Sequence, residues 1–133
     1  MIPARTIQKL IRAASQARKN AYAPYSKFHV GAAALGGSGK IYGGCNVENA
    51  SYGLTICAER SAIFGAVSAG EKKIRAVAIV YHPEHLASPC GACRQVIREF
   101  GKSTTVILAN TRGKFRIEPV EQLLPGSFGP EDL

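Results

Sequence analysis

The order of secondary-structure elements along the chain predicts an α/β layer fold with at least part of its sheet parallel. Apolar periodicity predicts, in order, helix, strand, strand, helix, strand, helix, strand and strand. Residues 74–81 and 104–109 are apolar runs typical of strands that are covered on both faces. Because helices alternate with such strands, we expect helices to pack on a partly parallel sheet. With 133 residues, 46% of them hydrophobic, the chain is long enough for a single domain, residues 1–133.

The first helix is predicted over residues 3–20. Its apolar side chains recur at helical spacing and would form one stripe, made of Ile7, Leu10, Ile11, Ala14 and Ala17. Pro3 suits the first turn of a helix, and Pro24 restricts the residue before it to extended conformations, so the helix should end before residue 24. The helix carries much of the positive charge, which we expect to be solvated, at Arg5, Lys9, Arg12, Arg18 and Lys19.

A β-hairpin should follow this helix. Strands are predicted at residues 28–35 and 40–45, on either side of a glycine-rich turn at residues 36–39. The polar stretch 46–55 is predicted to be a loop. The remaining elements are predicted as a helix at 57–69, a strand at 74–81, a loop at 82–88, a helix at 90–100, strands at 104–109 and 114–117, one helical turn at 120–124 and an irregular tail at 125–130.

The charge balance first suggests an anionic partner, since the net charge is +8. Residues 1–50 hold seven basic residues against one acidic residue, but these are scattered. The chain has no dense basic run with interleaved aromatic residues, as single-strand binders have. It also has no apolar stretch long enough to cross a bilayer and no secretory signal. We therefore expect a cytoplasmic protein that binds neither nucleic acid nor membranes.

Three of the four cysteines stand where two predicted helices begin. Cys57 starts a Cys-x-Glu motif that ends at Glu59, and Cys90 and Cys93 form a Cys-x-x-Cys motif directly after Pro89. The N-terminus of a helix favours the thiolate form of cysteine. Three thiolates leave one position of a tetrahedral zinc ion free, as in catalytic sites. Glu59 is too close to a ligand to share its face, but it could move protons beside that free position.

Other interpretations of these residues stay open at this point. A Cys-x-x-Cys motif also occurs in redox pairs and structural zinc sites, and Cys45 could be a fourth ligand, although we expect a buried free thiol there. Either Arg60 or Arg94 could offset the negative charge of three thiolates on a divalent ion. We expect His82 and His85, which flank a proline in a loop, to be solvated rather than to bind a second metal ion.

The sequence resembles the cytidine deaminases of the small, three-cysteine type. The resemblance extends from about residue 22 to the C-terminus and rests on residues 25–32, 44–52, 57–60, 88–95 and 123–130. Both cysteine motifs, in this order, also match the signature of zinc deaminases. The resemblance implies a three-layer α/β/α fold with a mixed five-stranded sheet, one Zn²⁺ per chain and a homotetramer whose active sites are completed by neighbouring subunits.

The resemblance also implies roles for particular residues. Cys57, Cys90 and Cys93 match the zinc ligands, and Glu59 matches the proton shuttle. Arg60 matches an arginine that hydrogen-bonds the ligand sulfurs. Substrate contacts are implied for Phe28 at the base, for Asn46 and Glu48 at the ribose hydroxyls, for Ala58, and, in the site of a neighbouring subunit, for Ala50, Tyr52 and Phe128.

The expected function is hydrolytic deamination of cytidine and 2′-deoxycytidine to the uridines, a reaction of pyrimidine salvage. A blasticidin-type deaminase shares the zinc motifs, but residues 46–49 and 128–133 favour a nucleoside. A deaminase acting on a polynucleotide would typically have His where Cys57 stands and would need a basic groove. In a zinc-stabilised binding module without activity, Glu59 would be dispensable.

Overall fold

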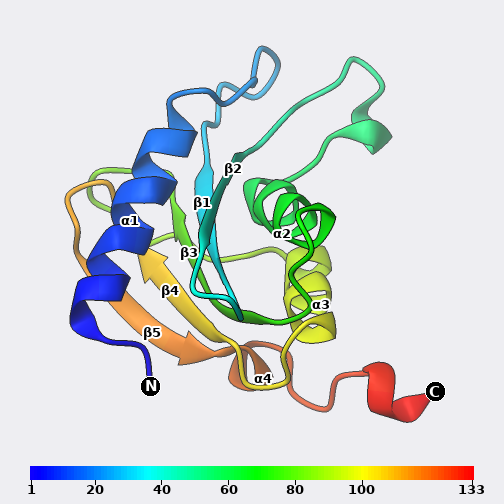
Figure 1. Ribbon diagram of the computed structural model, residues 1–133. Helices are drawn as coiled ribbons and strands as arrows, with labels where there is room; N and C mark the ends of the chain where they lie inside the picture. Colours follow the sequence, from blue (N-terminus) through cyan, green and yellow to red (C-terminus); the bar gives the residue numbers. More distant parts are fainter.

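A mixed sheet of five strands forms the centre of the computed structural model, which describes residues 1–133 (Figure 1). Its strands are β1 (Gly31–Gly36), β2 (Ile41–Cys45), β3 (Ile74–Val80), β4 (Thr105–Ala109) and β5 (Phe115–Pro119). Their order across the sheet is β2-β1-β3-β4-β5. β3 and β4 are parallel, whereas the other neighbouring pairs are antiparallel. The predicted mixed sheet is thereby confirmed.

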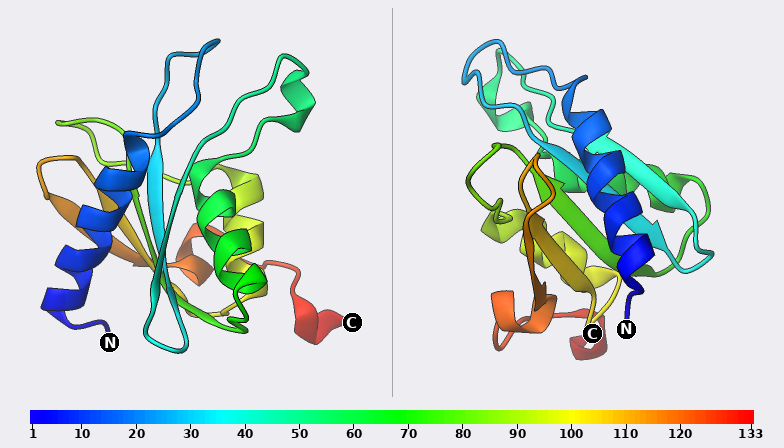
Figure 2. Two further views of the ribbon diagram at one scale, coloured as in Figure 1. Left: turned by 45° about the horizontal axis from the view of Figure 1, so that its top comes forward. Right: turned by 90° about the vertical axis from the view of Figure 1, so that its left-hand side faces the viewer.

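Helices cover both faces of this sheet. They are α1 (Ala4–Arg18), α2 (Ala58–Ser68), α3 (Gly91–Glu99) and the short α4 (Val120–Leu123), with 3₁₀ turns at Tyr52–Leu54 and Pro130–Asp132. Figure 2 shows α1 on one face and α2 and α3 together on the other. The core accordingly has two parts, one around Leu10 under α1 and one around Ile63 and Ile97 under α2 and α3. This is the predicted arrangement of three layers.

Two glycines let the helices lie close to the hairpin. A Cβ at Gly31 would lie 1.9 Å from the carbonyl oxygen of Ala14 in α1, and a Cβ at Gly44 would lie 2.4 Å from the backbone nitrogen of Ala62 in α2. No side chain fits in either place without moving the helix. The second contact fixes α2, whose first turn carries Glu59, against β2.

The predicted elements agree with the observed ones within two residues at each end, with one exception. The first strand was expected from Phe28 but begins at Gly31. The Asn46 side chain accounts for the difference, because it accepts a hydrogen bond from Val30 N at 2.9 Å and donates one to Phe28 O at 2.7 Å. Backbone groups that would pair in a strand are therefore bound to a side chain instead.

The expectation that the basic residues of α1 are solvated is wrong for one of them. Arg5, Lys9, Arg12 and Lys19 are exposed. Arg18 is only partly exposed, and its Nε donates hydrogen bonds to two backbone carbonyls, those of His29 and Tyr81, each at 3.0 Å. It thus joins the end of β3 to the segment ahead of β1.

Arg98 of α3 holds the C-terminal segment. Its side chain is buried; Nε donates a hydrogen bond to Ser127 Oγ at 2.8 Å, and Nη2 pairs with the Glu131 carboxylate. Hydrogen bonding from Arg98 lowers the pKa of Glu131. The stabilisation due to this carboxylate is therefore present at neutral pH and is lost as the pH falls through that lowered pKa.

Replacing Arg98 by methionine should lower the free energy of unfolding at neutral pH by about 1.5–3 kcal/mol, because charge-assisted hydrogen bonds are lost. Thermal unfolding at several pH values would measure this difference. It should shrink, without vanishing, as acid protonates Glu131 in the parent protein. Arg75→Met, at an exposed position of β3, is the matched control. A difference that stays constant from neutral to acidic pH would contradict the role given to Glu131.

Candidate active site

The three predicted metal ligands meet at the N-termini of α2 and α3. Cys57 caps α2, Cys90 caps α3, and Cys93 lies in the first turn of α3. Their Sγ atoms all lie within 4.8 Å of one another, and those of Cys57 and Cys90 are 3.9 Å apart. A tetrahedron with Zn–S bonds of about 2.3 Å has edges of about 3.8 Å. The donor set and its spacing therefore fit zinc, as predicted from the two motifs.

The surroundings of Cys57 favour its thiolate form, which is the form that binds a metal ion. Hydrogen bonding from Cys93 and the nearby Arg60 guanidinium lower the pKa of Cys57 to about 5, although partial burial opposes this. The same proton sharing and burial raise the pKa of Cys93. Cys57 is thus ionised at neutral pH, and a divalent ion bound by the cluster would displace the protons that remain.

Glu59 lies in the first turn of α2, and its side chain is 4% exposed. Burial, and after it the charge of Cys57, raises the pKa of this carboxyl to about 7. It lines the same cavity as Cys57 and Cys90. A carboxyl with this pKa can both give and take a proton near neutral pH, as a general acid and base must.

The structure distinguishes the two candidate arginines. Arg60 Nη2 donates a hydrogen bond to Cys57 Sγ at 3.3 Å, and its buried Nε has no partner. Arg94 instead donates to backbone oxygens of Pro89 at 2.8 Å and Leu123 at 2.7 Å. Arg60 is therefore the cation at the thiolates, whereas Arg94 ties the loop before α3 to α4.

Replacing Arg60 by glutamine should weaken zinc retention or activity by about 10–100-fold, since the thiolate charge would be less well balanced. Zinc content after dialysis against a chelator, together with kcat, would measure the effect. Arg112→Gln, at an exposed position, is the control. Wild-type zinc retention and activity in Arg60→Gln would show that this arginine is not needed at the thiolates.

A cavity of about 700 Å³ opens beside the sulfurs. Most of its lining residues are apolar. The predicted site residues in its wall are Phe28, Asn46, Glu48, Cys57, Ala58, Glu59 and Cys90. One cavity thus holds two of the three metal ligands, the buried carboxyl and the residues expected at the base and ribose, and the third ligand, Cys93, lies buried directly behind them.

Asn46 and Glu48 are also bound to the chain around them. Besides the contacts of Asn46 described above, Glu48 Oε1 accepts hydrogen bonds from Tyr25 N at 2.9 Å and Ser26 N at 3.1 Å, and Oε2 accepts one from Ser26 Oγ. Hydrogen bonding from Ser26 lowers the pKa of Glu48. The carboxylate therefore stays ionised, and both side chains are held in fixed positions at the cavity wall.

Three predicted substrate contacts lie outside this cavity. Ala50, Tyr52 and Phe128 are all exposed, the latter two at 75% and 59%. Within one chain they form no part of the wall. Their expected role, in the site of a neighbouring subunit, stays a prediction.

Other candidate residues do not join the site. Cys45 is half-buried and outside the cysteine cluster, and burial raises its pKa. The rings of His82 and His85 stack with centroids 4.3 Å apart, and His82 Nδ1 accepts a hydrogen bond from Glu84 N at 3.0 Å. These contacts describe a folded loop, and the histidines belong to no cluster of metal-ligating groups.

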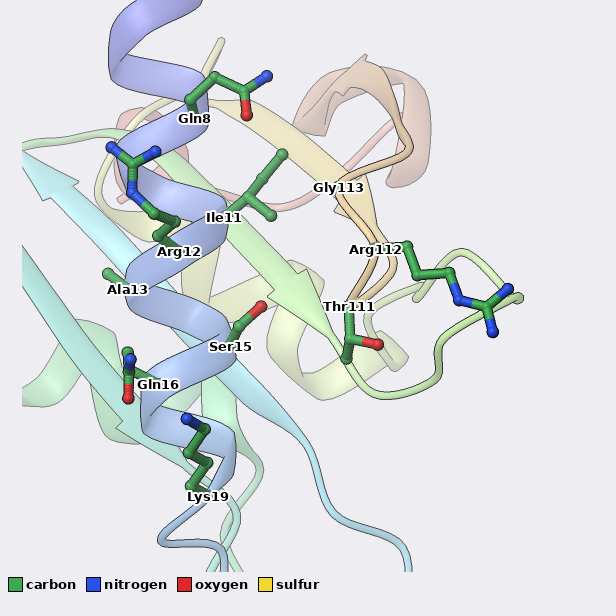
Figure 3. A pocket seen from close by; sticks show the side chains of 10 residues that line it. All are labelled: Gln8, Ile11, Arg12, Ala13, Ser15, Gln16, Lys19, Thr111, Arg112 and Gly113. Atoms are coloured by element: carbon green, nitrogen blue, oxygen red, sulfur yellow. The ribbon is translucent and has the colours of Figure 1, made fainter.

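A second cavity, of about 550 Å³, lies between α1 and the turn at residues 111–113. Its cations are Arg12, Lys19 and Arg112. Figure 3 shows their side chains pointing in different directions, so they do not converge on one anion. The structure thus gives no support to a nucleic-acid site here.

No helix is long and apolar enough to cross a membrane.

Sequence reasoning missed Tyr81, which also lines the cavity beside the sulfurs. It stands at the end of an apolar run and so resembled a core residue. A tyrosine ending a buried strand directly before a loop is the signal that could have identified it.

Comparison with known proteins agrees with this site. Residues 4–109 match the family described as the cytidine and deoxycytidylate deaminase zinc-binding region. A cytidine deaminase of Sporosarcina psychrophila is 52% identical over 128 residues, which cover 96% of this chain and 94% of that protein. One of Halalkalibacterium halodurans is 50% identical over 127 residues, covering 95% and 96% of the two chains.

Solved structures give the same picture. A crystal structure of cytidine deaminase from Burkholderia pseudomallei matches with a TM-score of 0.87 and 48% identity, covering 96% of this chain and 100% of that one. The cytidine deaminase of Bacillus anthracis is only 20% identical but has a TM-score of 0.74 over 92% of this chain and 89% of its own. That second likeness is one of fold.

Proposed function

The chain belongs to the cytidine and deoxycytidylate deaminase family, and from this premise we propose that it hydrolyses cytidine and 2′-deoxycytidine to the uridines and ammonia. One observation carries the proposal. Three cysteine sulfurs with the spacing of zinc ligands and a buried carboxyl with a raised pKa line or adjoin the same cavity. Relatives about half identical over nearly the whole chain carry the name of this activity.

Cys57, Cys90 and Cys93 would hold the zinc ion. Bound there, zinc would lower the pKa of a water molecule and so supply the nucleophile for carbon 4 of the pyrimidine ring. Arg60 donates to Cys57 Sγ and so offsets part of the thiolate charge, which would otherwise oppose the ionisation of that water.

Glu59 would act as the general base and the general acid. It takes one proton from the attacking water and gives it to ring nitrogen 3, and it passes the second water proton to the amino group. A carbon–oxygen bond forms at carbon 4, the carbon–nitrogen bond breaks, and ammonia leaves. The raised pKa of Glu59 suits both directions of transfer.

Phe28, Asn46, Glu48 and Ala58 would bind the nucleoside. Glu48 is ionised and fixed by Tyr25 and Ser26, so it can accept a hydrogen bond from a ribose hydroxyl without reorganising. A carboxylate oxygen can accept more than one hydrogen bond, so the contacts of Glu48 within the chain leave it able to accept one from a sugar hydroxyl as well. Asn46 donates a hydrogen bond to the backbone carbonyl of Phe28 and so fixes the segment whose aromatic ring would contact the base.

The assembly belongs to the same proposal. The chain would form a homotetramer in which Ala50, Tyr52 and Phe128 reach the site of a neighbouring subunit, and it would serve pyrimidine salvage in the cytoplasm. The exposure of Ala50, Tyr52 and Phe128 in the single chain supports the proposed contact with a neighbouring subunit. Light scattering of the purified protein would measure the assembly, and a monomer with full activity would contradict it.

A panel of substrates tests the proposed function. The ultraviolet absorbance of cytidine, 2′-deoxycytidine, blasticidin S and a single-stranded oligonucleotide would be followed with the zinc-loaded protein. We expect only the two nucleosides to react quickly. If blasticidin S reacts while cytidine stays intact, the argument from Asn46 and Glu48 is wrong. If none reacts, the binding module without activity becomes the better account.

A further inference from the structure

Tyr81 lies at the C-terminal end of β3, directly after the last residue of that strand, Val80. Side chains alternate along a strand, so Tyr81 lies on the same face as Ile79, the face covered by α2 and α3. Both Ile79 and Tyr81 line the cavity that also contains Glu59. The tyrosine packs on the core under α2 and α3 but remains partly exposed.

The ring of Tyr81 lies against that of Phe28. Their centroids are 4.7 Å apart and their planes are inclined by 36°, a favourable geometry for two aromatic rings. Phe28 is 50% exposed, although it is a large apolar side chain. Two segments far apart in the sequence therefore present one continuous aromatic surface to the cavity.

The backbone behind both rings is fixed. Arg18 Nε donates hydrogen bonds to the carbonyls of His29 and Tyr81, and Asn46 Nδ2 donates to that of Phe28. A partly buried guanidinium and a buried amide thus hold the two segments in register. The Tyr81 hydroxyl makes no hydrogen bond to another group of the chain. Tyr81 therefore contacts Phe28 through its ring and not through its hydroxyl.

We propose that Tyr81 is a further substrate-binding residue that contacts the flat pyrimidine ring directly, as the second half of an aromatic wall begun by Phe28. The inference rests on the proposed function and adds a residue to its site. A pyrimidine ring stacks on or against an aromatic side chain in the substrate and in the transition state alike. Losing the ring of Tyr81 should therefore raise KM and leave kcat nearly unchanged.

Affinity can be measured apart from turnover. In a Glu59→Gln background, which should bind cytidine without converting it, calorimetry gives Kd directly. Tyr81→Ala should weaken cytidine binding about 3- to 10-fold, whereas Tyr81→Phe should stay within about twofold. Phe115→Ala, an aromatic position on β5 away from the cavity, is the matched control and should leave Kd unchanged.

A supporting role behind Phe28 would give a different result. If Tyr81 contacts substrate itself, Tyr81→Ala should weaken binding further in a Phe28→Ala background. If it only holds the Phe28 ring, the second substitution adds nothing, and the inference is overturned. Circular dichroism and zinc content would establish that each variant is folded. Should Tyr81→Ala not fold, Tyr81→Leu keeps apolar bulk without a flat ring and should show the same loss.

The proposed function and the proposed role of Tyr81 can be refuted separately. If the unsubstituted protein turns over no cytidine, the proposed function falls whatever Tyr81 does. If it turns over cytidine and Tyr81→Ala has an unchanged Kd and KM, only the role of Tyr81 is refuted.

Discussion

The Glu59→Gln protein should keep its zinc and lose turnover by about 10²–10⁴-fold, the range for removing a general acid and base. Glutamine has nearly the shape of glutamate but cannot carry a proton between water and the ring. Glu59 is not one of the three metal ligands, so the metal site should stay intact. Steady-state kcat with cytidine and the zinc content per chain, measured on the same preparation, would check both parts.

Glu99→Gln supplies the matched control, since it makes the same substitution at an exposed position of α3. It should leave both quantities unchanged. If Glu59→Gln retained more than about a tenth of the wild-type kcat, the proton-transfer role would be wrong. Loss of zinc together with activity would instead mean that Glu59 acts by maintaining the metal site.

Replacing Cys93 by alanine should remove both zinc and activity. Its sulfur is fully buried at the point where α2 and α3 meet, and two sulfurs cannot complete the site. The loss of zinc affinity should exceed the ~10–100-fold that loss of a supporting residue causes. Because metal binding stabilises only the folded chain, the midpoint of thermal unfolding should also fall.

Cys45→Ala separates this effect from the loss of any thiol. Cys45 is a half-buried cysteine outside the cluster, so its alanine variant should bind zinc and turn over cytidine like the parent protein. A Cys93→Ala protein that still bound zinc tightly, or a Cys45→Ala protein that lost it, would contradict the ligand set assigned here.

The metal centre could be predicted from sequence because its residues stand at helix starts. Cys57 and Cys90 each follow a loop and precede an apolar helical stripe, and local chain geometry places such residues at a helix N-terminus. The pairing of the two helices follows from their position on one face of the sheet. No long-range side-chain information was needed.

Side-chain direction could not be predicted in the same way. Arg60 and Arg94 both stand close to ligands in sequence, yet one reaches a sulfur and the other reaches backbone carbonyls. Arg18 looked like part of a solvated face, but the carbonyls that it binds belong to segments 11 and 63 residues away. Tyr81 resembled core because nothing local shows that its strand ends at a cavity.

Formation of uridine and ammonia from cytidine by the purified, zinc-loaded protein is the most direct test of the account. Chromatography of the nucleosides and an enzymatic assay for ammonia would follow both products in one reaction. We expect both products to appear in equal amounts, and we expect a chelator to stop the reaction until zinc is restored. Cytidine left unchanged by a folded protein with zinc bound would contradict it.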